Sequence, residues 1–384
     1  MNVGNTPVHM KLWHKDLWYL VIANFCLMAS VYVLLPIVPV WMLHHGMSMG
    51  WTSLSLLAYG LGLYLPGPFV SGWVQQYRRN HVCETAMLLM VAVYGSLYFF
   101  GSGAPWILVV AAASTGSFLS LAQMVLSSTL VVDTCDSVHR TEANYASSWF
   151  GRLALALGPM VGFWVYGHYG ISLLLLMGIC ALGLSFFFIT LIRFPFKAPD
   201  ENMHRVGLDR FFLPHGFPLF VTLFLITTSF GLILSTQHAS HFFVMMMGGF
   251  LLAILAEKYV FANAELKSES IAGCLLIGAA ILLLWLRHGQ AVEIMAAVFS
   301  GLGIGLIGSR FLLFFIKLAK HCERGTSQST FFLGWETGLA VGLAGGYYLG
   351  RRHGVMLSAL VIIGMTLLLY NFVIHPWYLR NKNR

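Results

Sequence analysis

Long runs of apolar residues, separated by short polar connectors, recur about twelve times along this chain. Each run has the length of roughly 20 residues that an α-helix needs to cross the hydrocarbon layer of a bilayer. The first six predicted spans cover residues 17–43, 51–73, 82–101, 105–132, 143–167 and 171–192. The second six cover residues 217–236, 241–261, 271–286, 291–316, 327–349 and 355–377. The pattern predicts an all-α membrane protein with about twelve transmembrane helices.

The longest connector, residues 193–216, is rich in charged side chains and divides the chain near its middle. We therefore predict an N-terminal six-helix bundle over residues 1–192 and a C-terminal six-helix bundle over residues 217–384. The connector between them is predicted to be a cytoplasmic linker. This division leaves no stretch of the chain for a separate soluble domain.

The two halves also echo each other in sequence. A shift of 184 residues aligns Gly158 with Gly342. The same shift places Arg152 on Glu336. Duplicated halves that flank a central loop are a common plan of secondary transporters. We therefore predict two pseudo-symmetric bundles.

The composition agrees with a membrane protein. The chain is 58% hydrophobic and only 9% charged, and its mean hydropathy is +0.77. A soluble domain needs far more charged surface than this, because its outside faces water. The lipid bilayer is therefore the predicted partner of most of the protein surface.

Lysine and arginine are distributed unevenly among the connectors. One set of alternate connectors, together with both tails, holds 17 of the 22 lysines and arginines, whereas the opposite set holds 3. The positive-inside rule then predicts a multi-pass protein of the cell (inner) membrane with both termini in the cytoplasm. Orientation also explains the net charge of +8, since no basic patch interleaved with aromatic residues indicates nucleic-acid binding.

The sequence gives no indication of a cofactor, a metal site or an enzyme. Its six cysteines form no CxxC pair, and its fifteen histidines fall at or near span ends or in connectors. The glycines at 303–308 formally match a dinucleotide fingerprint, but they lie inside an apolar span with no preceding strand. No HExxH, GxSxG or phosphate-binding loop is present. We expect no cofactor and no catalysis.

The fifth predicted span reads GRLALALGPMVG over residues 151–162, with Gly158, Pro159 and Gly162. It resembles the antiporter motif of the major facilitator superfamily, in which a Gly-Pro pair is flanked by glycines at four-residue spacing. Together with six spans, a charged loop and six more spans, the resemblance covers nearly the whole chain. It implies two helical bundles, a small-molecule substrate, alternating access and a monomer.

The eleventh predicted span repeats the four-residue spacing at Gly338, Gly342 and Gly346. Glycines four residues apart line one face of a helix and let a neighbouring helix approach closely. The spacing therefore predicts either a contact at which helices slide during transport or ordinary tight packing.

The resemblance is partial. In the loop after the second span, Arg78 and Arg79 keep the paired basic residues of the family, whereas Val74 and Tyr77 stand where an Asp and a Gly would fall. The first span carries Asn24 where many multidrug exporters of the family have an acidic residue. The resemblance therefore implies the superfamily and no particular subfamily.

Three charged residues lie clearly inside predicted spans: Arg152, Arg310 and Glu336. A charge at mid-bilayer costs roughly 2.5–3.5 kcal/mol on insertion scales, so each needs a partner, water or a function. Burial disfavours the charged form of a carboxylate, whereas a nearby arginine favours it. We predict that Glu336 binds and releases protons, with Arg152 or Arg310 as its counter-charge. A static salt bridge that locks helices together is the alternative.

Trp335 is the one tryptophan deep within a predicted span, and it adjoins Glu336. It is predicted to pack against a flat face of the substrate or, equally, to fill space between helices. Other polar and aromatic residues are weaker candidates for lining a cavity, since hydrogen bonds between helices explain them as well. These candidates are Asn24, Tyr32, Tyr59, Tyr64, Gln123 and Thr227.

Charged residues also cluster at the cytoplasmic ends of the spans. They are predicted to form a charge clasp that closes the cytoplasmic side, and a solvated loop is the alternative. The members of this predicted gate are Arg78, Arg79, Asp133, Asp136, Arg140 and Glu142. Asp136 and Arg140 lie one helical turn apart, so they are expected to pair.

The sequence therefore predicts a secondary active transporter, with proton-coupled efflux of amphipathic, drug-like molecules as the preferred interpretation. A sugar or metabolite carrier, in which Glu336 and Arg152 bind the substrate directly, is the second interpretation. A membrane receptor or scaffold that transports nothing is the third. Flux driven by a pH gradient separates the first from the others.

Overall fold

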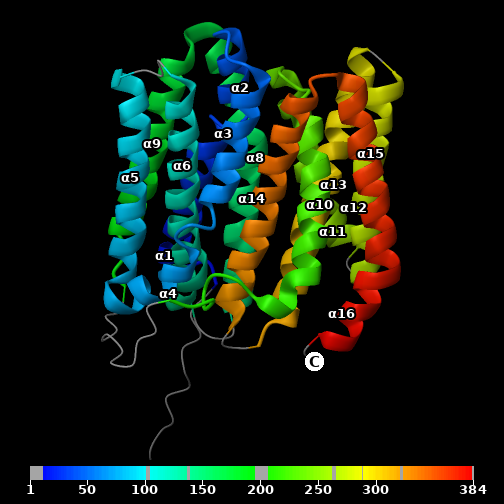
Figure 1. The fold of residues 1–384 in the computed structure, drawn as a ribbon. Helices are drawn as coiled ribbons and strands as arrows, with labels where there is room; N and C mark the ends of the chain where they lie inside the picture. Colours follow the sequence, from blue (N-terminus) through cyan, green and yellow to red (C-terminus); the bar gives the residue numbers. More distant parts are fainter. Residues whose placement is uncertain are drawn as a thin grey trace, which may run out of the picture.

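The computed structural model describes residues 12–100, 104–135, 139–194, 206–261, 265–287, 289–320 and 323–382. Within these ranges the chain is helical, and its long helices run side by side as one bundle (Figure 1). Helices satisfy their own backbone hydrogen bonds, which is what a chain inside a lipid bilayer requires. The predicted all-α membrane fold is confirmed.

The helices of the first half follow the predicted spans closely. They are α1 (Lys15–Tyr32), α2 (Ile37–His44), α3 (Met49–Gly62), α4 (Gly67–Gln76), α5 (Arg79–Phe100), α6 (Pro105–Val125), η1 (Leu126–Leu130), α7 (Val131–Asp133), α8 (Arg140–Tyr169) and α9 (Ile171–Thr190). Two predicted spans are broken at proline, after Tyr32 and after Gly62, because proline lacks the backbone N–H that continues a helix. At the second break α3 and α4 meet at an angle of 43°.

The second half has unbroken helices for its first two spans. Its elements are η2 (Pro214–Gly216), α10 (Phe217–Leu234), α11 (Ser240–Tyr259), α12 (Leu266–Leu286), α13 (Gln290–Leu318), α14 (Arg324–Leu349), α15 (Arg352–Leu369), η4 (Tyr370–Ile374) and α16 (His375–Asn381). We call the end of the bundle at which α1 begins and α16 ends the termini side, and the other end the opposite side (Figure 1).

In the described part of the chain, nine helical segments are long and apolar enough to cross a membrane, and the bent pair α3 and α4 makes a tenth. The other two predicted spans correspond to α8 and α14, which have 30 and 26 residues and stand among the rest in Figure 1. At ~1.5 Å per residue both are long enough to cross a bilayer. They are less apolar because they are packed inside the bundle, where protein rather than lipid surrounds them.

The helix pairs within each half match under the sequence shift. In the first half α1 packs on α8, α3 on α6, and α5 on α9; in the second half α10 packs on α14, α11 on α13, and α12 on α15. The contacts between halves match as well, because α3 packs on α14 and α8 packs on α11. Consequently α8 and α14 hold equivalent central places, and Arg152 and Glu336 lie on these two helices.

The predicted helix-packing glycines lie at close contacts between these helices. A Cβ atom added to Gly158 would lie 2.7 Å from the backbone of Tyr32, and one on Gly162 would lie 2.6 Å from the carbonyl oxygen of Val33. On α14 the glycines face α10, where a Cβ on Gly342 would lie 2.2 Å from a backbone oxygen. Gly338 packs closely on α10, Gly346 packs on Ser235 directly after α10, and Pro159 lies within α8. Close packing explains the spacing, and a sliding contact stays a prediction.

Candidate functional site

Glu336 lies in the middle of α14 and is completely buried. Its carboxylate accepts two hydrogen bonds from phenol groups of the first half. The Tyr32 hydroxyl of α1 donates to Oε1, and the Tyr59 hydroxyl of α3 donates to Oε2 at 2.9 Å. Two of the weaker cavity candidates thus contact the leading one, and all three come from helices that meet only in the folded protein.

Arg152 lies on α8 and is 4% exposed. Its Nε donates to the Ser148 carbonyl at 3.2 Å, which fixes the plane of the guanidinium group. The rings of Trp149, Phe331 and Trp335 surround the group, with centroids 4.8, 5.9 and 6.0 Å from Cζ. Such cation–π contacts stabilise the charge, but they use the face of the guanidinium and leave its N–H groups available.

Neither terminal nitrogen of Arg152 has a hydrogen-bond partner among the described residues. The guanidinium lies directly against Gly308 of α13, where an added Cβ atom would be 2.0 Å from one of these nitrogens. A glycine at this position is therefore what makes room for the arginine. A buried cation with unmade hydrogen bonds is costly, so this arrangement calls for a function.

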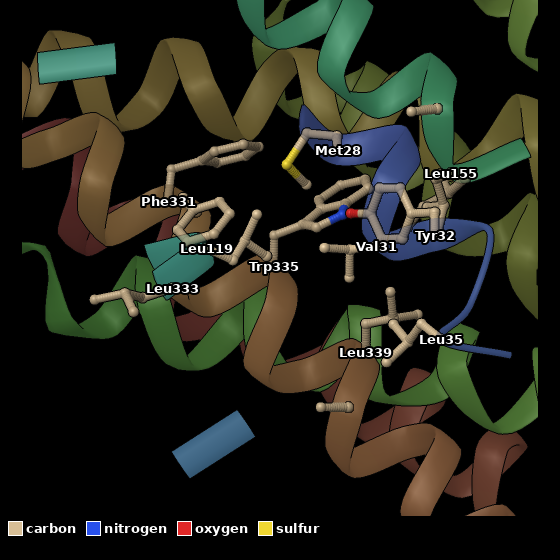
Figure 2. Close-up of a cluster of buried hydrophobic side chains, with 14 of the residues drawn as sticks. Met28, Val31, Tyr32, Leu35, Leu119, Leu155, Phe331, Leu333, Trp335 and Leu339 are labelled. Atoms are coloured by element: carbon tan, nitrogen blue, oxygen red, sulfur yellow. The ribbon is translucent and has the colours of Figure 1, made fainter. Parts of the chain in front are cut away.

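A cavity of about 40 Å³ lies between the two halves at this point. Both Arg152 and Glu336 line it, together with Tyr32, Trp335 and Gln123. The volume is enough for a few water molecules. Figure 2 shows the apolar wall of this region, where the side chains of Tyr32 and Trp335 point toward one another beside Met28.

Three amide side chains from α1, α6 and α8 and one from α14 add polar atoms to the cavity wall. Asn24 donates to the Ser147 carbonyl at 2.7 Å, which leaves its oxygen without a partner. The side-chain oxygens of Gln123 and Asn144 and the side-chain nitrogen of Gln328 also lack partners among the residues the structure describes. Unpartnered buried polar groups gathered around one space mark a place where water or a ligand binds.

Arg310 has a different partner from the one expected. It was predicted as a possible counter-charge of Glu336, but it forms a buried ion pair with Glu269 of α12. The span predicted from residue 271 begins about one turn too late, because the first turn of α12 carries the charged residues Lys267 and Glu269. Glu269 was therefore missed.

Tyr64 and Thr227 lie at the edge of the site. The Tyr64 hydroxyl is 2.9 Å from the hydroxyl of Thr337, the residue after Glu336. Thr227 of α10 donates to the Leu223 carbonyl of its own helix at 2.9 Å and packs against Gly338. Tyr64 thus joins the two halves, whereas Thr227 supports the packing of α10 on α14.

On the opposite side of Glu336 the two halves are in contact. The Ser53 hydroxyl of α3 donates to the Ala344 carbonyl of α14 at 2.9 Å. On the α8–α11 contact, the rings of Phe163 and Phe243 stack with centroids 5.5 Å apart. These contacts separate the cavity from the opposite side.

On the termini side a larger space adjoins the cavity. This vestibule has a volume of about 330 Å³ and shares the lining residues Asn144 and Gln328 with the cavity. Its charged lining residues are Arg140, Asp209, Arg210 and Arg324. Burial lowers the pKa of Arg210, and the neighbouring Arg79 guanidinium lowers it further. Because three arginines and a single aspartate line it, the vestibule is positively charged.

The predicted gate residues are divided between several contacts. Arg79 at the start of α5 forms an ion pair with Asp133 of α7, so this pair lies within the first half. Arg140 lines the vestibule, and the exposed Glu142 is 3.1 Å from His139. Arg78 also has an interaction partner. Asp136 lies outside the described residues, as does its predicted pairing with Arg140.

Contacts that do join the halves on the termini side were not predicted. The Tyr145 hydroxyl of α8 donates to Glu257 of α11 at 2.7 Å. Arg324 of α14 reaches the Thr141 hydroxyl at 3.4 Å. Glu257 could have been noticed in the sequence because it is an acidic residue near the end of an apolar predicted span.

No protein-family model matches the chain, and no curated protein sequence does so either. Solved structures match over nearly its whole length. The human organic anion transporter MFSD10 (TETRAN) matches with a TM-score of 0.67 at 12% identity, over 93% of this chain and 100% of its own. PepTSo, a transporter of the POT family, matches with a TM-score of 0.67 at 12% identity, over 96% of this chain and 98% of its own.

A bacterial homologue of the iron transporter ferroportin in an outward-facing state matches with a TM-score of 0.63 at 14% identity, over 93% of this chain and 99% of its own. At these identities the likeness concerns the fold. The chain has the major facilitator fold that its sequence predicts.

Proposed function

Because the chain has the major facilitator fold, we propose that it is a secondary transporter that moves a small organic molecule across a membrane by alternating access. The observation that carries the proposal is the buried polar cavity at the contact of the two halves, with Glu336 on one central helix and Arg152 on the other. Ionisable groups inside a membrane fold mark substrate and ion pathways by default. The three solved structures named above are those of transporters or of a transporter homologue.

The arrangement supports alternating access because a polar vestibule adjoins the cavity on one side and packed helices close it on the other. The vestibule adjoins it on the termini side, whereas the α3–α14 and α8–α11 contacts separate it from the opposite side. The contacts between halves are equivalent under the sequence shift, so a rocking motion would open one side as it closes the other. The charge distribution of the connectors supports a cytoplasmic termini side.

Glu336 is the proposed proton carrier. The groups that face its carboxylate are the phenols of Tyr32 and Tyr59, and Arg152 lines the same cavity. Phenol groups donate to either form of the carboxyl, so protonation leaves the site intact. No described lysine, arginine or histidine forms an ion pair with Glu336, and proton binding therefore breaks no salt bridge. The efflux direction and antiport stay predictions from the sequence.

The test uses purified protein in liposomes loaded with a pH-sensitive dye, with an imposed pH gradient. A panel of aromatic carboxylates, aromatic amines and sugars is added, and proton and compound fluxes are recorded. We expect at least one compound to be accumulated in response to the gradient by the native protein. Glu336→Gln should keep exchange of that compound but lose its response to the gradient.

Two results would refute the proposal. If no compound in the panel moves, the chain is a receptor or scaffold instead of a transporter. If Glu336→Gln accumulates the compound as the native protein does, the proton is carried elsewhere. Lys317→Gln, on the last turn of α13, serves as the control for removal of a charge outside the site.

A further inference from the structure

Arg152 lines the cavity, and both of its terminal nitrogens lack a hydrogen-bond partner among the described residues. Glu336 accepts from two phenols. Glu257, the carboxylate across the α8–α11 contact, accepts from Tyr145 through one oxygen, whereas its other oxygen has no partner among the described residues; Glu257 does not line the cavity. Within the described ranges neither carboxylate forms an ion pair with Arg152. Two N–H-bearing nitrogens of a buried guanidinium are thus left for a molecule that the protein itself does not provide.

The shape of this opening suits a planar anion. A guanidinium group presents parallel N–H bonds that match two oxygens of a carboxylate or a phosphate. The Ser148 carbonyl and the three aromatic rings hold the group in a single orientation. Gln328 supplies a further unpartnered N–H on the wall of the same cavity. A cationic ligand would find no free charged partner on the cavity wall, because Glu336 already accepts two hydrogen bonds and the unpartnered oxygens of Asn24, Gln123 and Asn144 belong to neutral amides.

The route to the site carries positive charge, which attracts an anion. The vestibule that adjoins the cavity carries three arginines and a single acidic residue, Asp209. A concave surface lined by one sign of charge raises the local concentration of the opposite sign and speeds its entry. A buried nitrogen atom of Arg140 and one of Arg210 lack hydrogen-bond partners among the described residues, so the vestibule also has unused donors.

We infer that the cavity binds the negatively charged group of an organic anion, with the terminal nitrogens of Arg152 as its main partners and the vestibule as its route from the termini side. The cavity of about 40 Å³ holds the charged group alone, and the rest of the molecule extends toward the vestibule of about 330 Å³. This inference rests on the proposed transport function and specifies its substrate class. It also assigns Arg152 a role in substrate binding, in place of its predicted role as the counter-charge of Glu336.

The test measures binding by calorimetry to the full chain in lipid nanodiscs. The probes are benzoate and phenyl phosphate as anions, benzamide as a neutral match, and benzylammonium as a cation of similar size. We expect the anions to bind and the other two to bind at least about 10-fold more weakly, as the loss of a charge-assisted hydrogen bond requires. Raised salt should slow anion association, because it screens the vestibule.

Two variants at the site make the result specific. Arg152→Gln should weaken anion binding by about 10- to 100-fold, and Arg152→Lys should recover only part of it because lysine lacks the planar fork. Gly308→Ala keeps the charge but places a Cβ atom where the guanidinium lies, so it should weaken anion binding as well. Arg351→Gln, at an exposed arginine on the opposite side, is the matched control and should bind as the native protein does.

Several results would overturn the inference. It fails if benzamide or benzylammonium binds as tightly as the anions, or if neither anion binds at millimolar concentration. It also fails if a folded Arg152→Gln protein, with native melting behaviour, binds anions normally. If Arg152→Gln does not fold, Gly308→Ala decides.

The liposome assay separates this failure from failure of the transport proposal. Gradient-driven movement of an amine or a sugar that depends on Glu336, without anion binding, would refute the anion site and keep the transporter. Arg152-dependent anion binding without any flux would keep the anion site and refute the transporter.

Discussion

Replacing Tyr59 with phenylalanine removes one of the two hydroxyl groups that hydrogen-bond to Glu336 and leaves the aromatic ring in place. The Tyr59 hydroxyl donates to the carboxylate at 2.9 Å, and both side chains are buried, with exposed fractions of 2% and 0%. Because the site is buried, bulk water does not take over the role of the lost donor. The change therefore acts on the proton equilibrium of one carboxyl group.

The magnitude follows from the strength of that hydrogen bond. A hydrogen bond to a charged group contributes about 1.5–3 kcal/mol, and donors of this kind favour the carboxylate over the carboxylic acid. One pH unit corresponds to about 1.36 kcal/mol, so the midpoint of a proton-dependent step at Glu336 should move to higher pH by about 1–2 units. The maximal rate at low pH should change little.

The measurement is the pH dependence of gradient-driven uptake in proteoliposomes, for the native protein and for Tyr59→Phe. Tyr64→Phe is the matched control: this tyrosine contacts the neutral hydroxyl of Thr337, also at 2.9 Å. Its midpoint should equal the native value. An unchanged midpoint in Tyr59→Phe, or the same shift in both variants, would refute the assignment of the proton to Glu336.

Two further predictions concern stability. Glu269→Gln leaves Arg310 buried without its charged partner and should lower the free energy of unfolding by about 3–5 kcal/mol. Joint replacement of Glu269 and Arg310 by leucine should lower it far less, because no unpaired charge is left. Equal losses of stability in thermal melts of the two variants would contradict this prediction. Burial lowers the pKa of His238 in the connector after α10, so the unfolded chain binds a proton before the folded one as the pH falls. The stability that His238 contributes is thus fully present above its unfolded pKa of ~6.5 and is lost below it, and the melting temperature of His238→Phe should decline less on acidification than that of the native protein.

Most of the fold could be predicted because a bilayer leaves a chain few options. Each predicted span corresponds to a helix or to helices in direct succession, since the backbone must satisfy its own hydrogen bonds in lipid. The breaks after Tyr32 and Gly62 depend on proline and were not assigned in advance. Span ends were the weakest point, as the missed first turn of α12 shows.

The site could be predicted in its members but not in its contacts. A charge in an apolar span stands out in the sequence, so Arg152 and Glu336 were candidates at once. Their partners come from other helices, and which residues meet depends on the rotation and depth of each helix. Sequence alone therefore could not show that phenols, and no arginine of the described residues, hydrogen-bond to Glu336, or that Gly308 makes room for Arg152.

The polarity of α8 and α14 has a consequence for how the protein is made. The insertion machinery passes a segment into lipid according to its hydrophobicity, and these two helices are absent from the set that meets that requirement. Each is followed directly by one of the most apolar helices, α9 or α15, and packs against it. We therefore expect α8 and α14 to enter the bilayer as hairpins with their successors, which would make biogenesis depend on the neighbouring helices.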